Sequence, residues 1–154
     1  MVKIPYHENT WQIKEKNSWP SKNDVSVAMK IFYREWKKSF GDPDRKVYEA
    51  LNKLMIEWHD PRERKILGYS MDGKMLRGRV RGTALSPTYI TIRKTAYKRI
   101  ASTSLVHELV HVALWNSGNI LGDPDHEGMK YSGWTRKHTI FIKNLNNLLA
   151  NIDI

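Results

Sequence analysis

The chain has 154 residues, of which 40 % are hydrophobic and 27 % are charged, and it contains no Cys. This length and composition indicate one globular domain, and the lack of Cys excludes disulfides, thiolate zinc sites and a Cys nucleophile. Any metal must therefore be held by His and carboxylate side chains. The formal net charge of +10 favours anionic partners, first nucleic acid, and then a membrane surface or an acidic protein.

The start of the chain indicates where the protein is found and where its domain begins. The first residues, MVKIPYHEN, lack the apolar run of a signal peptide, and no stretch approaches the ~18 apolar residues that span a bilayer. We therefore expect a cytoplasmic protein with no membrane span. Residues 1–23 are polar and contain the breaker Pro20, so we expect an N-terminal arm there and a single domain over 24–154.

Two helices are expected at the start of this domain. After Asp24, a favourable N-cap residue, apolar side chains recur at helical spacing as far as Gly41. After the turn GDPD, residues 45–58 repeat this helical pattern. The sequence therefore predicts a helical pair ahead of any strand.

Strands are expected in the next part of the chain. Their ranges are 65–71, 74–85 and 88–94, and the turn Asp72-Gly73 makes the first two a hairpin. In the second strand Arg77, Arg79 and Arg81 alternate with Gly and Val, which places the three guanidinium groups on one face. This face is either the solvated outside of an antiparallel sheet or a stripe that binds substrate or phosphate.

Two further helices are expected, a nearly all-apolar one over 102–116 and an amphipathic one over 135–150. The predicted fold class is therefore α+β. It has a small, mostly antiparallel sheet of three or four strands, with two helices before it and two after it.

The segment HELVH at 107–111 points to metal chemistry. Positions i and i+4 lie on the same face of a helix, so His107 and His111 can bind one zinc ion at about 2.0 to 2.1 Å. Glu108 is rotated by about 100° from them and can act as a general base without binding the metal. Because the other side chains of this helix are apolar, the alternative is a pair of core histidines bonded to backbone carbonyls.

A catalytic zinc site needs a third protein ligand. The downstream candidates are Asp123, Asp125, His126, Glu127 and His138. His138 and Tyr131 could also donate a hydrogen bond to a tetrahedral oxyanion, although a surface or capping role is the simpler expectation. Trp115 and Trp134 could wall the site, but we expect both in the core.

The stretch HELVHVALWNSGNILGDPDHEG resembles the SprT-like metalloproteases over residues 103–131. The resemblance implies a zincin-like fold with one Zn²⁺ ion, which His107, His111 and His126 would bind, and with Glu108 as the general base. The carboxylates of Asp125 and Glu127 are the alternative third ligands.

The resemblance also implies a zinc metallopeptidase that acts on DNA-associated or crosslinked proteins. The positive charge agrees with a nonspecific, salt-dependent contact to DNA. The basic residues expected to make it are Arg77, Arg79, Arg81, Arg93, Lys94, Lys98 and Arg99. A protein or peptide substrate is expected to bind extended along an edge strand, supplied by TYITIRK at 88–94 or by the Arg-rich strand.

Two other functions stay open. A different zinc peptidase could cut peptidoglycan peptides or one dedicated protein such as a repressor. Alternatively, a basic nucleic-acid-binding domain could keep the metal for folding only. Glu108 argues against that second alternative, because a purely structural site does not need a general base.

Overall fold

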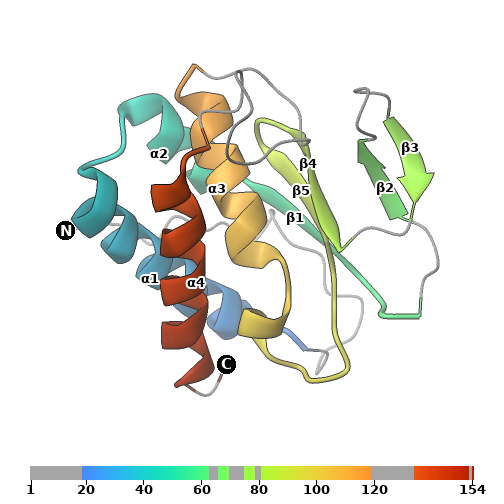
Figure 1. The fold of residues 1–154 in the computed structure, drawn as a ribbon. Helices are drawn as coiled ribbons and strands as arrows, with labels where there is room; N and C mark the ends of the chain where they lie inside the picture. The colour runs from blue at the N-terminus through green and yellow to red at the C-terminus, as the bar shows by residue number, and fades with distance from the viewer. Residues whose placement is uncertain (1–18, 63–65, 70–74, 79–80, 119–133, 153) are drawn as a thin grey trace.

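The computed structural model describes residues 19–62, 66–69, 75–78, 81–118, 134–152 and 154, with the backbone alone for 66–69 and 75–78. These residues form an α+β fold with four α-helices and five short strands (Figure 1). The helices are α1 (Lys22–Phe40), α2 (Arg45–Asn52), α3 (Leu105–Asn116) and α4 (Arg136–Ala150), with a 3-10 turn, η2 (Ile100–Ser102), before α3. The strands are β1 (Met55–His59), β2 (Ile66–Tyr69), β3 (Met75–Gly78), β4 (Gly82–Ser86) and β5 (Tyr89–Arg93).

Helix α1 begins earlier than the sequence predicts, because its N-cap is Ser21 rather than Asp24. The Asp24 backbone N–H donates to Ser21 Oγ, and the Ser21 N–H donates to Asp24 Oδ2, each over 3.1 Å. Both residue types cap helices well, and this reciprocal pair uses both of them. The predicted end at Gly41 is confirmed, with a φ of 87° that favours glycine. Residues 1–18 of the expected arm lie outside the described residues.

The predicted second helix is wrong beyond Asn52. Residues 55–59 instead form β1, which pairs in parallel with β5. Its apolar residues fit a helical spacing, yet alternation also fits them, since Ile56 is buried and its neighbour Met55 is exposed. A short apolar run is ambiguous between helix and strand, and here the distant partner strand decides.

The predicted Arg-rich strand over 74–85 is also wrong as a single element. The predicted antiparallel pairing of β2 with β3 is confirmed, but β3 ends at Gly78 and a separate strand, β4, begins at Gly82. Because β4 pairs with β5 in another sheet, Arg77 and Arg81 do not share one strand face. Glycine weakens a strand interior and marks such breaks.

The larger sheet has the strand order β1-β5-β4 and is mixed rather than mostly antiparallel. β5 pairs in parallel with β1 and antiparallel with β4. The segment TYITIRK, which contains β5, is therefore the middle strand and cannot supply an open edge. The strand β4 lies at the edge of this sheet.

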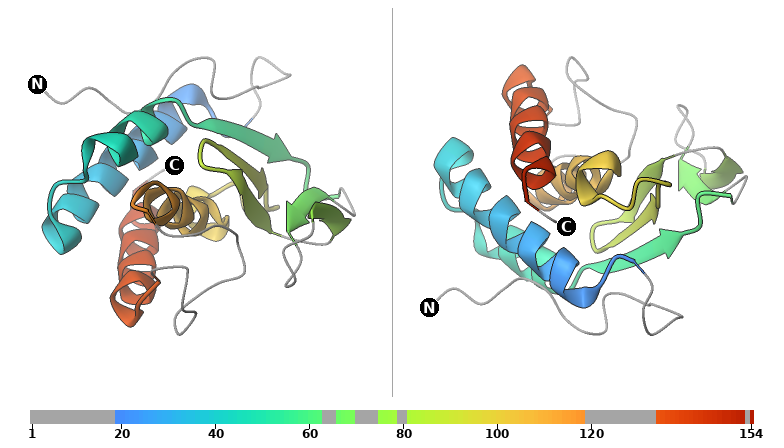
Figure 2. Two further views of the ribbon diagram at one scale, coloured as in Figure 1. Left: turned by 90° about the horizontal axis from the view of Figure 1, so that it is seen from above. Right: turned by 90° about the horizontal axis from the view of Figure 1, so that it is seen from below.

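Helix α3 lies at the centre of the described fold. Figure 2 shows α3 nearly end-on. The helices α1 and α2 lie on one side of it, α4 lies on a second side and the sheet lies on a third. Helix α3 packs against α2, α4 and β4, and its buried apolar side chains belong to one core cluster that also contains Ile90 and Ile92 of β5. Both predicted C-terminal helices are confirmed, although α3 begins at Leu105 after η2.

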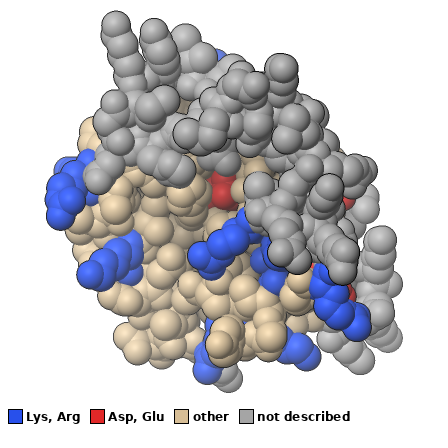
Figure 3. Space-filling model, turned by 45° about the vertical axis from the view of Figure 1, so that its right-hand side comes forward, with Lys and Arg blue, Asp and Glu red and all other residues tan. Residues whose placement is uncertain are grey.

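Among the described residues, those on the face in Figure 3 form no single dense basic patch. Lys and Arg side chains are spread over that face with neutral surface between them. Among the described helices, none is both long and apolar enough to cross a bilayer.

Candidate metal centre

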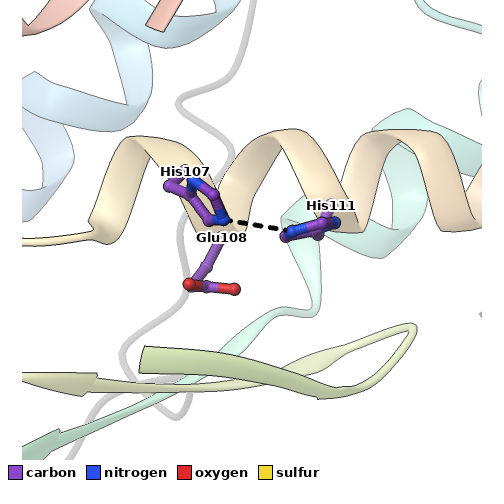
Figure 4. Close-up of side chains that lie close together, drawn as sticks. All are labelled: His107, Glu108 and His111. Atoms are coloured by element: carbon purple, nitrogen blue, oxygen red, sulfur yellow. Dashed lines mark hydrogen bonds between the residues drawn. The ribbon is translucent and has the colours of Figure 1, made fainter. Parts of the chain in front are cut away.

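Two imidazoles converge on one point of α3. His107 and His111 are one turn apart, and their Nε2 atoms are 3.2 Å from each other (Figure 4). The ring centroids are 4.8 Å apart. His111 is only 4 % exposed and His107 is partly buried. The structure thus brings together the two nitrogens that the sequence spacing predicts as ligands.

This separation fits two ligands of one metal ion. Tetrahedral zinc binds imidazole nitrogens at about 2.0 to 2.1 Å, so two of its nitrogen ligands lie roughly 3.3 Å apart. The observed 3.2 Å between the Nε2 atoms matches that value. His107 and His111 could therefore hold a metal ion without moving their rings apart.

Glu108 completes a group of three ligand-type side chains. The residue is 2 % exposed, and its carboxylate points from α3 toward the sheet (Figure 4). The ligand atoms of His107, Glu108 and His111 all lie within 4.8 Å of one another. Burial of a carboxylate is unfavourable unless its charge is compensated, and a cation between the imidazoles would compensate it.

Trp134 forms one wall of this centre. Its ring centroid is 4.9 Å from that of His107 and 4.7 Å from that of His111. The indole is 5 % exposed, and its Nε1–H donates to Thr139 Oγ1 on α4 over 2.9 Å. The sequence predicts Trp134 in the core, with a wall of the site as the alternative, and the residue is buried and also contacts both imidazoles. The available signal was an aromatic residue directly before a helix N-cap.

The start of α4 holds Trp134 in place. His138 Nδ1 lies 3.0 Å from the backbone N of Thr135 and 2.8 Å from its Oγ1. The His138 ring also stacks on Phe40, with centroids 4.4 Å apart. Burial, and then the charge of Lys137, lower the pKa of His138 from its ordinary value. His138 therefore has the capping role that is the simpler expectation from the sequence. Its Nδ1 contacts Thr135 at the start of α4 and not the pair of imidazoles on α3.

The predicted candidates for a third ligand, apart from His138, lie outside the described residues. That part of the chain contains Asp123, Asp125, His126, Glu127 and Tyr131. Within the described residues, His107, Glu108 and His111 form the one group of at least three His, Cys, Asp or Glu side chains close enough to hold a metal ion.

The structure describes the side chains of five of the seven predicted nucleic-acid-binding residues. Arg81 Nη2 donates to the Ser102 carbonyl over 2.8 Å, and Arg99 Nη1 donates to the Ile152 carbonyl over 3.2 Å. These two exposed side chains therefore brace the backbone near η2. Arg93 and Lys94 are partly buried and Lys98 is exposed. Of the other two, the backbone of Arg77 is in β3 and Arg79 lies outside the described residues.

Comparisons of the chain with family models, curated proteins and solved structures find no match. The resemblance to SprT-like metalloproteases therefore stays a prediction that rests on residues 103–131. Of the site residues that it implies, His107, Glu108 and His111 are described and His126 lies outside the described residues.

Proposed function

We propose that the protein is a zinc-dependent metallopeptidase of the SprT-like, zincin type. The observation that carries the proposal is the 3.2 Å separation of the His107 and His111 Nε2 atoms beside a buried carboxylate. A structural zinc site explains the two imidazoles but gives no role to Glu108. A hydrolytic site gives a role to all three side chains.

Each side chain has a defined task in this proposal. His107 and His111 hold the ion, with His126 as the third ligand and Asp125 or Glu127 as the alternatives. Zinc, when bound, supplies a Lewis acid that polarises a carbonyl and activates water. Glu108 accepts the proton from that water and returns it to the leaving amine.

Trp134 contributes to the same chemistry by excluding water. Its indole covers both imidazoles and is itself 5 % exposed. A dry surrounding strengthens the electrostatic interactions between the ion, Glu108 and a polarised carbonyl.

The fold suggests how a substrate would bind. β4 is one of the two edge strands of the larger sheet, and it packs against α3. An extended peptide that adds to such an edge places its backbone beside the helix that carries the metal ligands. This mode favours unfolded segments or loops as substrates.

The net charge of +10 supports substrates that are themselves bound or crosslinked to DNA. Several of the predicted basic residues lie in the chain segment that leads from β5 into α3. A contact of this kind is nonspecific and weakens steeply with added salt. Lysis of whole cell walls by the purified protein would instead favour the peptidoglycan alternative.

Metal analysis of untagged protein tests the ligand assignment. We expect one zinc per chain in the wild type and its loss in both His107→Ala and His126→Ala. His59→Ala is the matched control, because His59 lies on β1 away from the centre, and it should keep the zinc. A wild type that binds no zinc after zinc is offered would overturn the proposal. Zinc retained by His126→Ala would move the third ligand to a carboxylate.

A further inference from the structure

The edge strand and the metal-binding helix meet at a glycine. Gly82, the first residue of β4, lies against the first turn of α3. A Cβ atom at this position would lie 2.4 Å from Ser104 Oγ and 3.3 Å from Glu108 Oε2. It would also lie 2.7 Å from the carbonyl oxygen of Thr91 on β5. Real Cβ atoms do not approach other atoms below about 3 Å, so any side chain at Gly82 forces a rearrangement.

The surrounding backbone has little room to move away. Ser104 Oγ donates to the Arg81 carbonyl over 3.0 Å, which ties the start of α3 to the residue before β4. The same carbonyl accepts from the Arg93 N–H over 2.8 Å, so β5 holds it as well. Thr91, which supplies the other close oxygen, is 0 % exposed in the middle strand.

The hydrogen bond between Ser104 and the Arg81 carbonyl is connected to Glu108 through one helical turn. The Glu108 N–H donates to the Ser104 carbonyl over 2.9 Å. Ser104 therefore fixes the helix backbone one turn before Glu108. Gly82 has no side chain, and the Glu108 carboxylate lies next to the space that a side chain would fill. A shift of this junction moves the carboxylate relative to the two imidazoles.

We infer that Gly82 and Ser104 are positioning residues that set where the Glu108 carboxylate lies. This inference deepens the proposed function and rests on it for its catalytic consequence. A general base must come within about 2.6 to 3.2 Å of the proton that it accepts. A displacement of about 1 Å can lower a rate by roughly 100-fold, so the size of residue 82 limits turnover without touching the metal ligands.

The test compares Gly82→Ala with Ala28→Gly in the full chain. Ala28 is buried on α1, so its replacement weakens the fold without adding an atom beside Glu108. We expect Gly82→Ala to keep one zinc per chain and to lose kcat by about 10- to 100-fold, with KM little changed. Ala28→Gly should keep its kcat when folded. In a Glu108→Gln background, Gly82→Ala should cause no further loss of kcat, whereas a merely structural role would lower it again.

A second readout does not depend on activity. In zinc-free protein, Gly82→Ala should lower the urea midpoint of unfolding less in a Glu108→Ala/Ser104→Ala background than in the wild type, because two of the crowded side chains are then shortened. Equal shifts in the two backgrounds, or full kcat in Gly82→Ala, would overturn the inference and leave the proposed peptidase function unaffected. A wild type without peptidase activity would refute the proposed function. The unfolding comparison would then still show whether residue 82 is crowded by Ser104 and Glu108.

If Gly82→Ala does not fold, the variant Ser104→Ala tests the same inference. Ser104→Ala removes the hydroxyl that bonds the Arg81 carbonyl and adds no atom. We expect a several-fold loss of kcat with the zinc retained, and no loss in the Glu108→Gln background. An unchanged kcat in Ser104→Ala would contradict the positioning role of this junction.

Discussion

At the residue scale, the centre depends on an aromatic contact as well as on its ligand-type side chains. Trp134 lies against both imidazoles and is anchored to Thr139 through its Nε1. Groups that orient metal ligands from outside the ligand set typically change affinity by 10- to 100-fold when they are removed. Trp134 contacts the imidazole rings and donates its Nε1–H to Thr139, not to their nitrogens. We therefore expect its effect on metal affinity to be about 10-fold.

Replacement of Trp134 measures this contribution. We expect Trp134→Ala to bind zinc about 10-fold more weakly in a competition titration with a chromophoric chelator. Trp134→Phe keeps a ring in place and should lose less. Trp58→Phe, on β1, is the control and should bind zinc as the wild type does. Equal affinity in Trp134→Ala and the wild type would contradict the positioning role of the indole.

His138 gives the stability a pH dependence. Its folded-state pKa is lowered from 6.5, first by burial and then by Lys137, so the unfolded chain binds the proton more readily. Its neutral form caps α4 at Thr135. The contribution is therefore full above pH 6.5 and is lost as the pH falls through the lowered pKa.

A matched variant isolates this effect. Glutamine at the third helical position completes a capping box without titrating, so His138→Gln keeps a cap at every pH. We expect the free energy of unfolding of the wild type, relative to His138→Gln, to fall as the pH drops below 6.5. Parallel pH curves for the two proteins in urea titrations would refute the assignment.

At the scale of elements, the sequence predicts those with strong local patterns. The C-terminal end of α1, both ends of α4 and the placement of HELVH on a buried helix follow from caps and from 3.6-residue periodicity. The start of α1 was missed because Ser21 and Asp24 are equally good caps. β1 and the break between β3 and β4 were missed because pairing with β5 is decided by residues far away in the chain.

The identity of β1 can be tested with two neighbouring residues. In the strand, Ile56 is 1 % exposed and Met55 is 43 % exposed, because successive side chains point to opposite faces. Ile56→Ala should lower the free energy of unfolding by roughly 2 to 5 kcal/mol. Met55→Ala should change it by less than about 0.5 kcal/mol. Similar losses for both in urea denaturation would contradict the alternation.

The site was only partly predictable for a related reason. His107, Glu108 and His111 lie within one turn, so their spacing alone brings them together. Trp134 and Gly82 reach the same place from α4 and β4. The position of Trp134 directly before the N-cap of α4 is a weak local signal, and nothing local marks Gly82, since each contact depends on how separate elements pack.

At the scale of the whole molecule, a resident zinc ion would stabilise the fold through linkage. Zinc at about 100 times its Kd adds about 2.7 kcal/mol, which corresponds to roughly 5 to 10 °C in Tm for a chain of this size. We expect excess EDTA to lower the Tm of the wild type by that amount in calorimetry. His107→Ala should show a low Tm with or without EDTA. A Tm of the wild type that ignores EDTA would argue against a resident metal.

The proposed function requires the imidazole pair and Glu108 to act together as one hydrolytic site. Cleavage of casein by zinc-loaded wild type and by zinc-loaded Glu108→Gln tests it most directly, with zinc content measured on the same samples. We predict one zinc per chain in both proteins and at least about a 100-fold loss of cleavage in Glu108→Gln, because the general base is removed while the ligands stay. Cleavage that is equal in the two zinc-loaded proteins, or absent from the wild type, would contradict the account.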